Sequence, residues 1–457
     1  MGNLYTFQEQ YENALETYAA SIRLASKTRD NALAARALTN AALVSIQMQQ
    51  NRQALGFLDR AWEDIKHLHT TKDTVHSLIS MGRAYAQLLP LLPGRQNHLV
   101  RRVIASFRDA ISRAETIDAL RAASYAWGYL GQLYEAQQQY RDALQSTRMA
   151  LLQVQHVHAP ESLYRWQWQM GRLLTRMGRP NQAIKAYEDA VETLESFRYE
   201  TTASYSQTVD FQQAVAPVYF QLVDLLLERA NVLEQQPRAD TDSQYEHYLY
   251  QARTIMEQFK VVELQDYFQD ECIQALQAKE KPLEAIIDPN TMVIYPILLP
   301  DRTELLVSLS TGLHRFSVPV SSAALTKQVN QFRKHLEHRT THRYLPYAEQ
   351  LYTWLIRPLE PLLTPSIETL VFVPDGILRT IPLGALHDGN AFLVEKHAVA
   401  MLLGTTLNDP RALSEDDVRV LAAGLTEAVE GFSPLIYASK ELEFLEKTYG
   451  SKPLLNE

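Results

Sequence analysis

The chain has 457 residues, and its 53 acidic side chains outnumber its 44 lysines and arginines, which gives a formal net charge of −9. This balance argues against a surface dominated by nucleic-acid contacts. The single cysteine, Cys272, excludes an intramolecular disulfide framework and favours a reducing, cytoplasmic location. The sequence has no run of 18 apolar residues, so no membrane span is predicted. The length predicts two or three domains.

The first two hundred residues repeat one pattern of small and bulky side chains. One slot recurs at intervals of 40, 49, 40 and 40 residues and holds Ala14, Ala54, Val103, Ala143 and Ala183. A second slot, 12 residues earlier (21 in the third unit), holds Gly2, Ala42, Gly82, Gly131 and Gly171. A third, four residues after the first, holds Tyr18, Leu58, Phe107, Thr147 and Tyr187. Five units in register predict a solenoid of stacked helix pairs.

The spacing of these slots explains how each unit would pack. Positions three, four and seven residues apart lie on one face of a helix. Small side chains let two helices approach closely, and the bulky side chains fill the remaining gaps. Because Gly2 already occupies a slot of the first helix, we expect the chain to begin inside a unit whose start is missing.

The last two units carry a resemblance to a known family. The residues Gly131, Tyr134, Ala143, Thr147 and Ala150 resemble the tetratricopeptide repeat, as do Gly171, Gly178, Ala183, Tyr187 and Ala190. The familiar unit has 34 residues, so helices or turns longer by about six residues are expected. The resemblance implies a right-handed superhelix in which the first helix of each unit lines a concave groove, where protein partners bind.

Counting along the first helices places a cationic and aromatic patch in this groove. Arg165, Trp168, Arg172 and Arg176 follow one another at spacings of three, four and four, and Arg83 takes an equivalent position two units earlier. Such a patch suits an acidic peptide or a terminal carboxylate. The alternative is a solvated face with incidental arginines. The equivalent positions of the third and fourth units are His76, Ile79, Arg83 and Gln87, and Tyr125, Gly128, Gln132 and Ala136.

Beyond about residue 200 the repeat register is lost, although helical periodicity continues. Residues 209–232 and 245–278 have apolar side chains at helical spacing, and we expect these helices to cap the end of the solenoid. Cys272 lies in this region with no histidine at a fixed spacing. It is therefore interpreted as a packing or surface residue rather than a nucleophile.

The pattern changes at Lys281-Pro282. Residues 291–299, 304–310 and 313–318 are short and rich in β-branched side chains, and the last two are expected to form a hairpin. Helices are expected at 321–338 and 346–357, strands at 369–373 and 418–424, an extended stretch near 392–402, and a final helix at 439–449. Strands alternating with helices predict an α/β domain with a largely parallel sheet.

Residues 283–457 resemble the CHAT domain, a caspase-like domain found together with tetratricopeptide repeats. The resemblance rests on Pro374-Asp375-Gly376-x-Leu378, Ile381-Pro382-Leu383, Ala385-Leu386, Asp388-Gly389, Leu393-Val394 and the Val420-Leu421 strand that leads to Glu441. It implies a clan-CD cysteine peptidase, in which a histidine helps to deprotonate a cysteine thiol that attacks the peptide carbonyl.

The dyad itself is expected on strands beyond Glu457, so the resemblance gives this chain no catalytic residue and, as written, no peptidase activity. His387 and His397 precede the relevant strand and have no cysteine partner. We expect the front half of a caspase-like sheet, with an open strand edge and exposed apolar surface.

The sequence gives little support for nucleotide or metal binding. No glycine-rich phosphate loop occurs, so no cofactor is predicted. His335, His338 and His342 have the spacing of one helix face, but Arg339 and Arg343 beside them oppose a cation, and no metal site is predicted.

The sequence thus predicts three regions: a repeat array over 1–198, a helical cap or linker over 199–280, and the first part of a caspase-like domain over 281–457. The favoured function is a protein-interaction module that recruits or senses a partner for a peptidase domain, with no nucleic-acid or membrane partner. The alternative is a non-catalytic scaffold with an inert docking domain.

Overall fold

The computed structural model describes residues 1–155, 157–201, 215–235, 242–268, 283, 287–338, 341–405, 420–428, 437–450 and 452–455. Cys272 and the first two residues of the strand predicted at 418–424 lie outside these ranges. The chain divides into two compact units, Met1–Ala275 with Pro282–Thr405, and Leu276–Lys281 with Thr406–Glu457. None of the helices in the described ranges is both long and apolar enough to cross a membrane.

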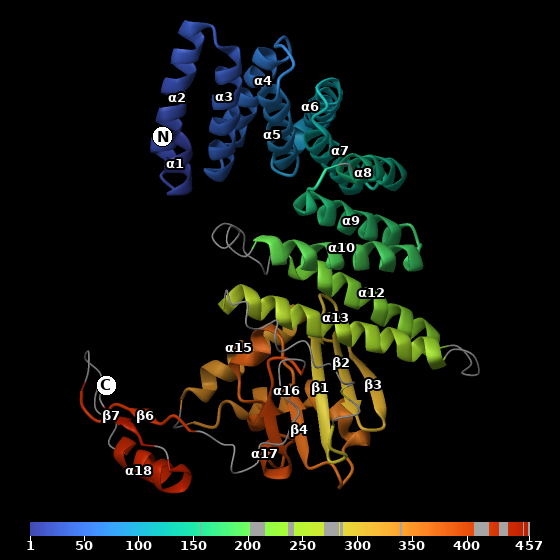
Figure 1. The fold of residues 1–457 in the computed structure, drawn as a ribbon, viewed down its shortest axis with the longest axis vertical. Helices are drawn as coiled ribbons and strands as arrows, with labels where there is room; N and C mark the ends of the chain where they lie inside the picture. The colour runs from blue at the N-terminus through green and yellow to red at the C-terminus, as the bar shows by residue number, and fades with distance from the viewer. Residues whose placement is uncertain are drawn as a thin grey trace. The chain divides into compact units, whose positions relative to one another are not determined.

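The first unit begins with antiparallel helix pairs that follow one another along the chain (Figure 1). The helices are α1 (Gly2–Phe7), α2 (Tyr11–Thr28), α3 (Asn31–Gln47), α4 (Asn51–Ile65), α5 (Lys72–Leu88), α6 (Gln96–Thr116), α7 (Leu120–Ala136), α8 (Tyr140–Gln155), α9 (Pro160–Arg176) and α10 (Pro180–Thr201). The predicted solenoid of helix pairs is therefore confirmed.

In three of the units the glycine slot faces the bulky slot of the same helix pair. A Cβ atom built on Gly2 would lie 2.6 Å from the Tyr18 ring, one on Gly82 would lie 2.7 Å from Phe107, and one on Gly171 would lie 2.8 Å from Tyr187. These distances are shorter than van der Waals contact, so the two helices can approach this closely only where the side chain is absent. The slots inferred from sequence spacing are the places where the paired helices touch.

The turn inside a unit also repeats. Glu9, Gln49, Gln138 and Gly178 end the first helices in the left-handed conformation, with φ of 57°, 61°, 59° and 68°. The next amide in each turn donates to the carbonyl five residues earlier, at 2.8–2.9 Å. This is the hydrogen bond of a Schellman cap, which satisfies a helix-terminal carbonyl and reverses the chain.

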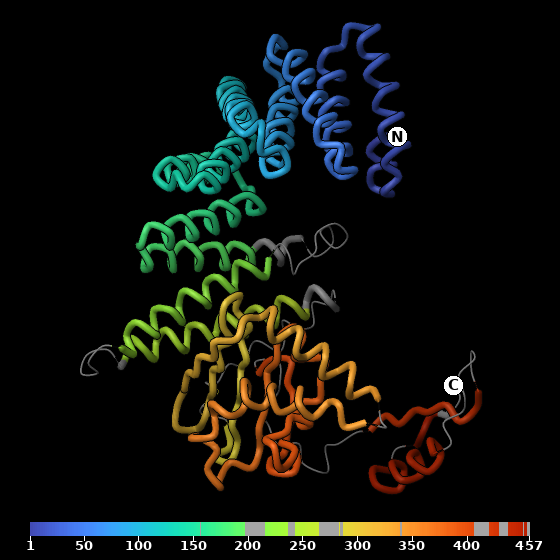
Figure 2. The backbone as a smooth tube through the Cα atoms, turned by 180° about the vertical axis from the view of Figure 1, so that it is seen from behind, coloured from blue at the N-terminus to red at the C-terminus, as the bar shows by residue number. Residues whose placement is uncertain are grey.

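Beyond the repeats, α12 (Ala216–Glu234) packs on α10, and α13 (Asp242–Phe268) packs on α12. Figure 2 shows both helices between α10 and the strands. The strands are β1 (Thr291–Leu298), β2 (Thr303–Leu309), β3 (Gly312–Val318), β4 (Thr369–Phe372) and β5 (Ala398–Met401), and the remaining helices of this part are α15 (Ser322–Leu336), α16 (Leu345–Leu355) and the short α17 (Leu393–Lys396). Three 3₁₀ segments complete it, at Arg357–Leu362, Gly376–Thr380 and Leu383–Ala385.

The five strands form one mixed sheet in the order β3-β2-β1-β4-β5. β1, β4 and β5 are parallel to one another, while β2 pairs antiparallel with both β1 and β3. The predicted hairpin is confirmed, as β2 and β3. The prediction of a largely parallel sheet was wrong for the pairs β1–β2 and β2–β3. Two tight turns join these three strands, and a tight turn can connect only antiparallel neighbours.

Alternate residues of β1 face two different layers of helices. Val293, Tyr295 and Ile297 join a core shared with α12, α13 and the last repeats. Met292 and Ile294 face a second core shared with α15 and α16. The helices expected to cap the solenoid therefore also form one outer layer of the α/β part.

A buried carboxylate ties the hairpin of β2 and β3 to α12. Glu304 is fully buried and accepts from Arg302 Nε at 2.6 Å, Arg315 Nη2 at 2.9 Å and Ser317 Oγ at 3.1 Å. The two arginines continue to α12, where Arg302 contacts Asp224 at 2.6 Å and Arg315 contacts Glu234 at 3.2 Å. A chain of alternating charges thus crosses from the sheet to the helix.

Within its described residues, the second unit has two very short parallel strands and one helix. β6 (Ala423–Gly424) pairs with β7 (Leu454–Leu455), and α18 (Ala438–Tyr449) covers them. A Cβ atom on Gly424 would lie 2.8 Å from Leu442 Cδ1, so this glycine lets the helix lie close to the strand. The predicted final helix at 439–449 is confirmed within one residue.

The strand β5 forms an edge of the five-stranded sheet. Met401 at its end is 43% exposed, and Leu403 just beyond is 51% exposed. Among the described residues, no strand pairs with the outer side of β5. An exposed edge strand is a template for pairing with another chain, and an added charge blocks such pairing.

We expect Met401→Lys to reduce concentration-dependent self-association severalfold, measured by static light scattering. Leu24→Lys is the matched control, because Leu24 is 59% exposed on α2 and lies on no sheet edge. Equal scattering from the wild type and Met401→Lys would show that β5 does not pair between molecules.

Candidate partner-binding face of the solenoid

The first helices of successive units pack directly on one another, α3 on α5, α5 on α7 and α7 on α9. Side chains from neighbouring units can therefore form one continuous surface on this side. The predicted groove residues lie on these helices, Arg83 on α5 and Arg165, Trp168, Arg172 and Arg176 on α9. Four of these five residues fall into two pairs with different surroundings, and Arg176 belongs to neither pair.

Arg172 and Trp168 belong to a paired cluster. Arg172 donates to Glu135 of α7 through Nε at 2.8 Å and Nη2 at 2.9 Å, and its guanidinium lies 4.6 Å from the centre of the Trp168 ring. The Trp168 indole donates to Gln221 of α12 at 2.8 Å. Because Glu135 neutralises Arg172, this cluster is a contact between neighbouring helices rather than a free cation.

Arg83 and Arg165 flank two tyrosines of α7. The guanidinium of Arg83 lies 5.0 Å from the centre of the Tyr129 ring, and the rings of Tyr129 and Tyr125 stack with their centres 6.0 Å apart. Both tyrosines are half-buried. Arg165 lies over the Tyr164 ring at 5.8 Å, and its buried Nε has no hydrogen-bond partner among the described residues. We call Arg83, Tyr129, Tyr125 and Arg165 the arginine–tyrosine strip.

Tyr125 keeps its phenolic proton throughout the physiological range. Burial, reinforced by the negative charge of Glu161, raises the pKa of Tyr125 to about 12. A neutral phenol can both donate and accept a hydrogen bond. The strip therefore offers aromatic surface, hydrogen-bonding hydroxyls and guanidinium groups in one place.

The strip rests on a fully buried tryptophan. Trp166 of α9 meets the rings of Tyr125 and Tyr129 edge-on, with centroid distances of 6.0 Å and 5.6 Å. Its Nε1 donates to Ser124 Oγ at 3.0 Å. The placement of Gly128 in the groove was wrong: a Cβ atom there would lie 2.3 Å from the Trp166 ring, so Gly128 is packing surface for the next unit. Ile79, 7% exposed, is likewise a core residue.

Arg176 is exposed at the end of α9. The residues predicted for the groove did not include Tyr129. The count along α7 selected Tyr125 and skipped the residue four positions later. A search for aromatic pairs at a spacing of four would have found Tyr129, since such residues are neighbours on one helix face.

The histidines considered for chemistry have structural contacts. The His335 ring stacks on Tyr347 at 5.1 Å, and within the described ranges no three His, Cys, Asp or Glu side chains are placed to hold a metal ion. His387 Nδ1 accepts from the Gly389 amide at 3.1 Å, and His397 Nδ1 lies 2.9 Å from the Ile367 carbonyl. Both therefore stabilise turns around the strands.

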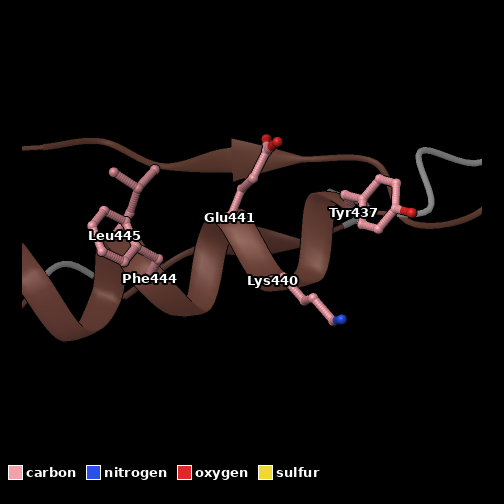
Figure 3. Close-up of a pocket in the computed structure, with 5 residues that line it drawn as sticks. All are labelled: Tyr437, Lys440, Glu441, Phe444 and Leu445. Carbon is pink, nitrogen blue, oxygen red and sulfur yellow. The ribbon is translucent and has the colours of Figure 1, made fainter.

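In the second unit, α18 carries a shallow concavity lined by Tyr437, Lys440, Glu441, Phe444 and Leu445 (Figure 3). Tyr437 and Phe444 are 67% and 66% exposed. The concavity is open and lined by one cation and one anion, so it selects no ligand charge.

Two family models match separate parts of the chain, the tetratricopeptide repeat over residues 121–196 and the CHAT domain over residues 345–457. No curated protein matches it.

Several solved structures are similar at 14% identity. The crystal structure of BtubC (BKLC) from P. vanneervenii aligns over 54% of this chain and 91% of its own, with a TM-score of 0.36. The apo form of RapI aligns over 56% and 96%, with a TM-score of 0.35. A Podosopora anserina putative kinesin light chain with nearly identical TPR-like repeats aligns over 49% and 95%, with a TM-score of 0.34.

Residues 121–196 therefore form a tetratricopeptide-repeat region and residues 345–457 match the CHAT domain, in agreement with the helix pairs and the mixed sheet described above.

Proposed function

We propose that the solenoid is the recognition arm of a peptidase-like protein. It binds a protein or peptide partner on the face of its first helices and thereby recruits or senses that partner for the CHAT domain. The repeats support protein binding, and the CHAT family supports a role in cysteine-peptidase chemistry. We place this activity in the cytoplasm, where a lone cysteine stays reduced.

The arginine–tyrosine strip is the observation that carries this proposal. It draws on three successive first helices, so an extended peptide lying across them would meet every member of the strip. Tyrosine rings provide apolar contact at low entropic cost, and a guanidinium without a carboxylate partner favours an acidic side chain. Among the described residues, Arg83 and Arg165 have no carboxylate within ion-pair distance. We therefore propose an acidic partner segment.

The predicted anchors divide into two roles under this proposal. Arg83 and Arg165 contact the partner, and the exposed Arg176 adds long-range attraction. Arg172 and Trp168 fix the relative position of α7, α9 and α12, because they contact Glu135 and Gln221. Replacing Arg172 would then act through stability rather than through direct loss of a partner contact.

We expect the double variant Arg83→Ala/Arg165→Ala to bind acidic peptides about tenfold more weakly, since two charge-assisted hydrogen bonds are lost. The measurement is fluorescence polarisation with the tightest acidic peptide selected on a peptide array, repeated at low and high salt. The matched control is Arg141→Ala/Arg148→Ala, which removes the same charge from exposed positions of the second helix α8. If both double variants weakened binding equally, the effect would be due to net charge, and the strip would not be the binding site.

The alternative function is a non-catalytic scaffold, with the CHAT domain as an inert docking domain. The two differ in what happens to a bound partner. A peptidase role needs a histidine and a cysteine dyad in the protein that carries this domain, and it predicts partner cleavage that a thiol-reactive inhibitor stops. A scaffold role predicts an intact partner with or without the inhibitor.

A further inference from the structure

Helix α13 contacts the solenoid side and the sheet at the same time. On one side the Phe259 ring packs on Tyr219 and Phe220 of α12, with centroid distances of 5.7 Å and 5.2 Å, and Gln251 donates to Glu188 of α10. On the other side Arg253 donates to Ser308 of β2 at 2.9 Å. A displacement of α12 would therefore directly change the packing of α13.

A buried lysine of α13 holds the segment that follows β4. Lys260 is 1% exposed, and its Nζ donates to Asp375 Oδ1 at 2.7 Å and to the Pro374 carbonyl at 3.2 Å. Arg379, in the same segment, reaches Glu263 of α13 at 2.6 Å. Two cations thus join α13 to the residues 374–379.

A buried glutamate one turn earlier holds the segment that follows β5. Glu257 is 6% exposed and accepts from the Thr405 amide at 3.0 Å, from Thr405 Oγ1 at 2.9 Å and from the Tyr295 hydroxyl of β1 at 2.7 Å. Glu257 and Lys260 are three residues apart, so they share one face of α13. One turn of α13 therefore holds the two segments that follow the neighbouring parallel strands β4 and β5.

These contacts transmit motion because buried charges cannot be left without partners. A carboxylate or ammonium group drawn away from its partner inside a protein keeps its desolvation cost and loses its compensation. A shift of α13 must then either carry residues 374–379 and 402–405 with it or be resisted by them. In open α/β sheets, ligands bind just outside the carboxyl ends of the parallel strands, which is where these two segments lie.

We propose that α13 is a coupling helix, through which a displacement of α12 by the solenoid moves the segments following β4 and β5 by way of Lys260 and Glu257. The inference depends on the proposed function only for what displaces α12 in the cell. Its test needs no partner, so a failed peptide-binding experiment leaves it standing.

The test is hydrogen exchange of the full chain, read by mass spectrometry, after loosening α13 from its solenoid side with Phe220→Ala. We expect exchange in residues 374–380 and 402–405 to rise about tenfold, because local opening of α13 releases both segments. Exchange in α3, which packs on α2, α4 and α5 in the repeats, should stay unchanged and reports any global unfolding. If Phe220→Ala unfolds the chain, Phe220→Leu gives the same comparison with a smaller change.

The decisive comparison uses Lys260→Met/Asp375→Asn/Arg379→Met as the background, which removes both ion pairs between α13 and residues 374–379 and leaves Glu257 in place. There, Phe220→Ala should no longer change exchange in 374–380 but should still raise it in 402–405. In a Glu257→Gln background the pattern should be reversed. Phe220→Ala should then raise hydrogen exchange in 374–380 but no longer change it in 402–405. An unchanged response of 374–380 to Phe220→Ala in the Lys260→Met/Asp375→Asn/Arg379→Met background would overturn the proposal. So would faster exchange of α13 that leaves both segments unaffected in the otherwise wild-type chain.

Discussion

Replacing Glu304 with alanine is expected to lower the free energy of unfolding by about 3–5 kcal/mol, the loss typical when one partner of a buried ion pair is removed. Glu304 is fully buried, and Arg315, its main partner, is only 4% exposed at the side chain. Without the carboxylate, two guanidinium groups lose their central acceptor inside the protein. The measurement is urea-induced unfolding followed by far-ultraviolet circular dichroism.

Two variants bracket this expectation. Glu304→Gln keeps the size and one acceptor oxygen, so a smaller loss is expected. Arg333→Gln breaks an exposed pair with Glu337 at 3.6 Å, and it should change stability by at most about 0.5 kcal/mol, as surface pairs do. If Glu304→Ala cost no more than Arg333→Gln, the charge chain between β2 and α12 would contribute nothing to folding.

Gly128→Ala is expected to lower the free energy of unfolding by about 1–3 kcal/mol, the usual cost of overpacking a core. The new methyl group would lie 2.3 Å from the Trp166 ring, which is fully buried and held by its hydrogen bond to Ser124. The ring has no space to retreat, so α7 and α9 must separate. The thermal unfolding midpoint of the full chain measures this change.

The control for this variant is Gly56→Ala. Gly56 also lies inside a helix, α4, but a Cβ atom there would meet nothing within 4 Å. Alanine restrains the unfolded chain and favours a helix, so Gly56→Ala should raise stability by about 0.5–1 kcal/mol. Opposite signs at the two glycines would isolate the close approach of Trp166. A stabilising Gly128→Ala would mean that the two helices can move apart at no cost.

The repeat region could be predicted because its determinants are local and recur. Gly82 and Phe107 occupy fixed slots, and the same pairing appears at Gly2 with Tyr18 and at Gly171 with Tyr187. Periodicity fixes which face of a helix is buried, and five copies of the pattern remove the ambiguity of one copy. The Gly128 error shows the limit of this reasoning. A glycine outside the repeated slots gives no sign of which neighbour it accommodates, and here the neighbour is Trp166.

The junction of α13 with the sheet could not be predicted from the sequence. Lys260 and Asp375 are separated by 115 positions, and Glu257 and Thr405 by 148. Periodicity shows that a helix has an apolar face but not which distant charge its polar residues meet. The same limit affected the predicted groove patch, which included Arg172 among its cations, whereas Arg172 is paired with Glu135 of the previous unit.

The position of α13 between two packed layers restricts how the chain can change in length. Each residue added to an α-helix rotates everything after it by about 100° and advances it by about 1.5 Å. One residue inserted between Gln251 and Glu257 would leave the contact with Glu188 in place and turn Glu257 and Lys260 away from Thr405 and Asp375. A segment that looks from its sequence like a linker therefore tolerates no insertion or deletion.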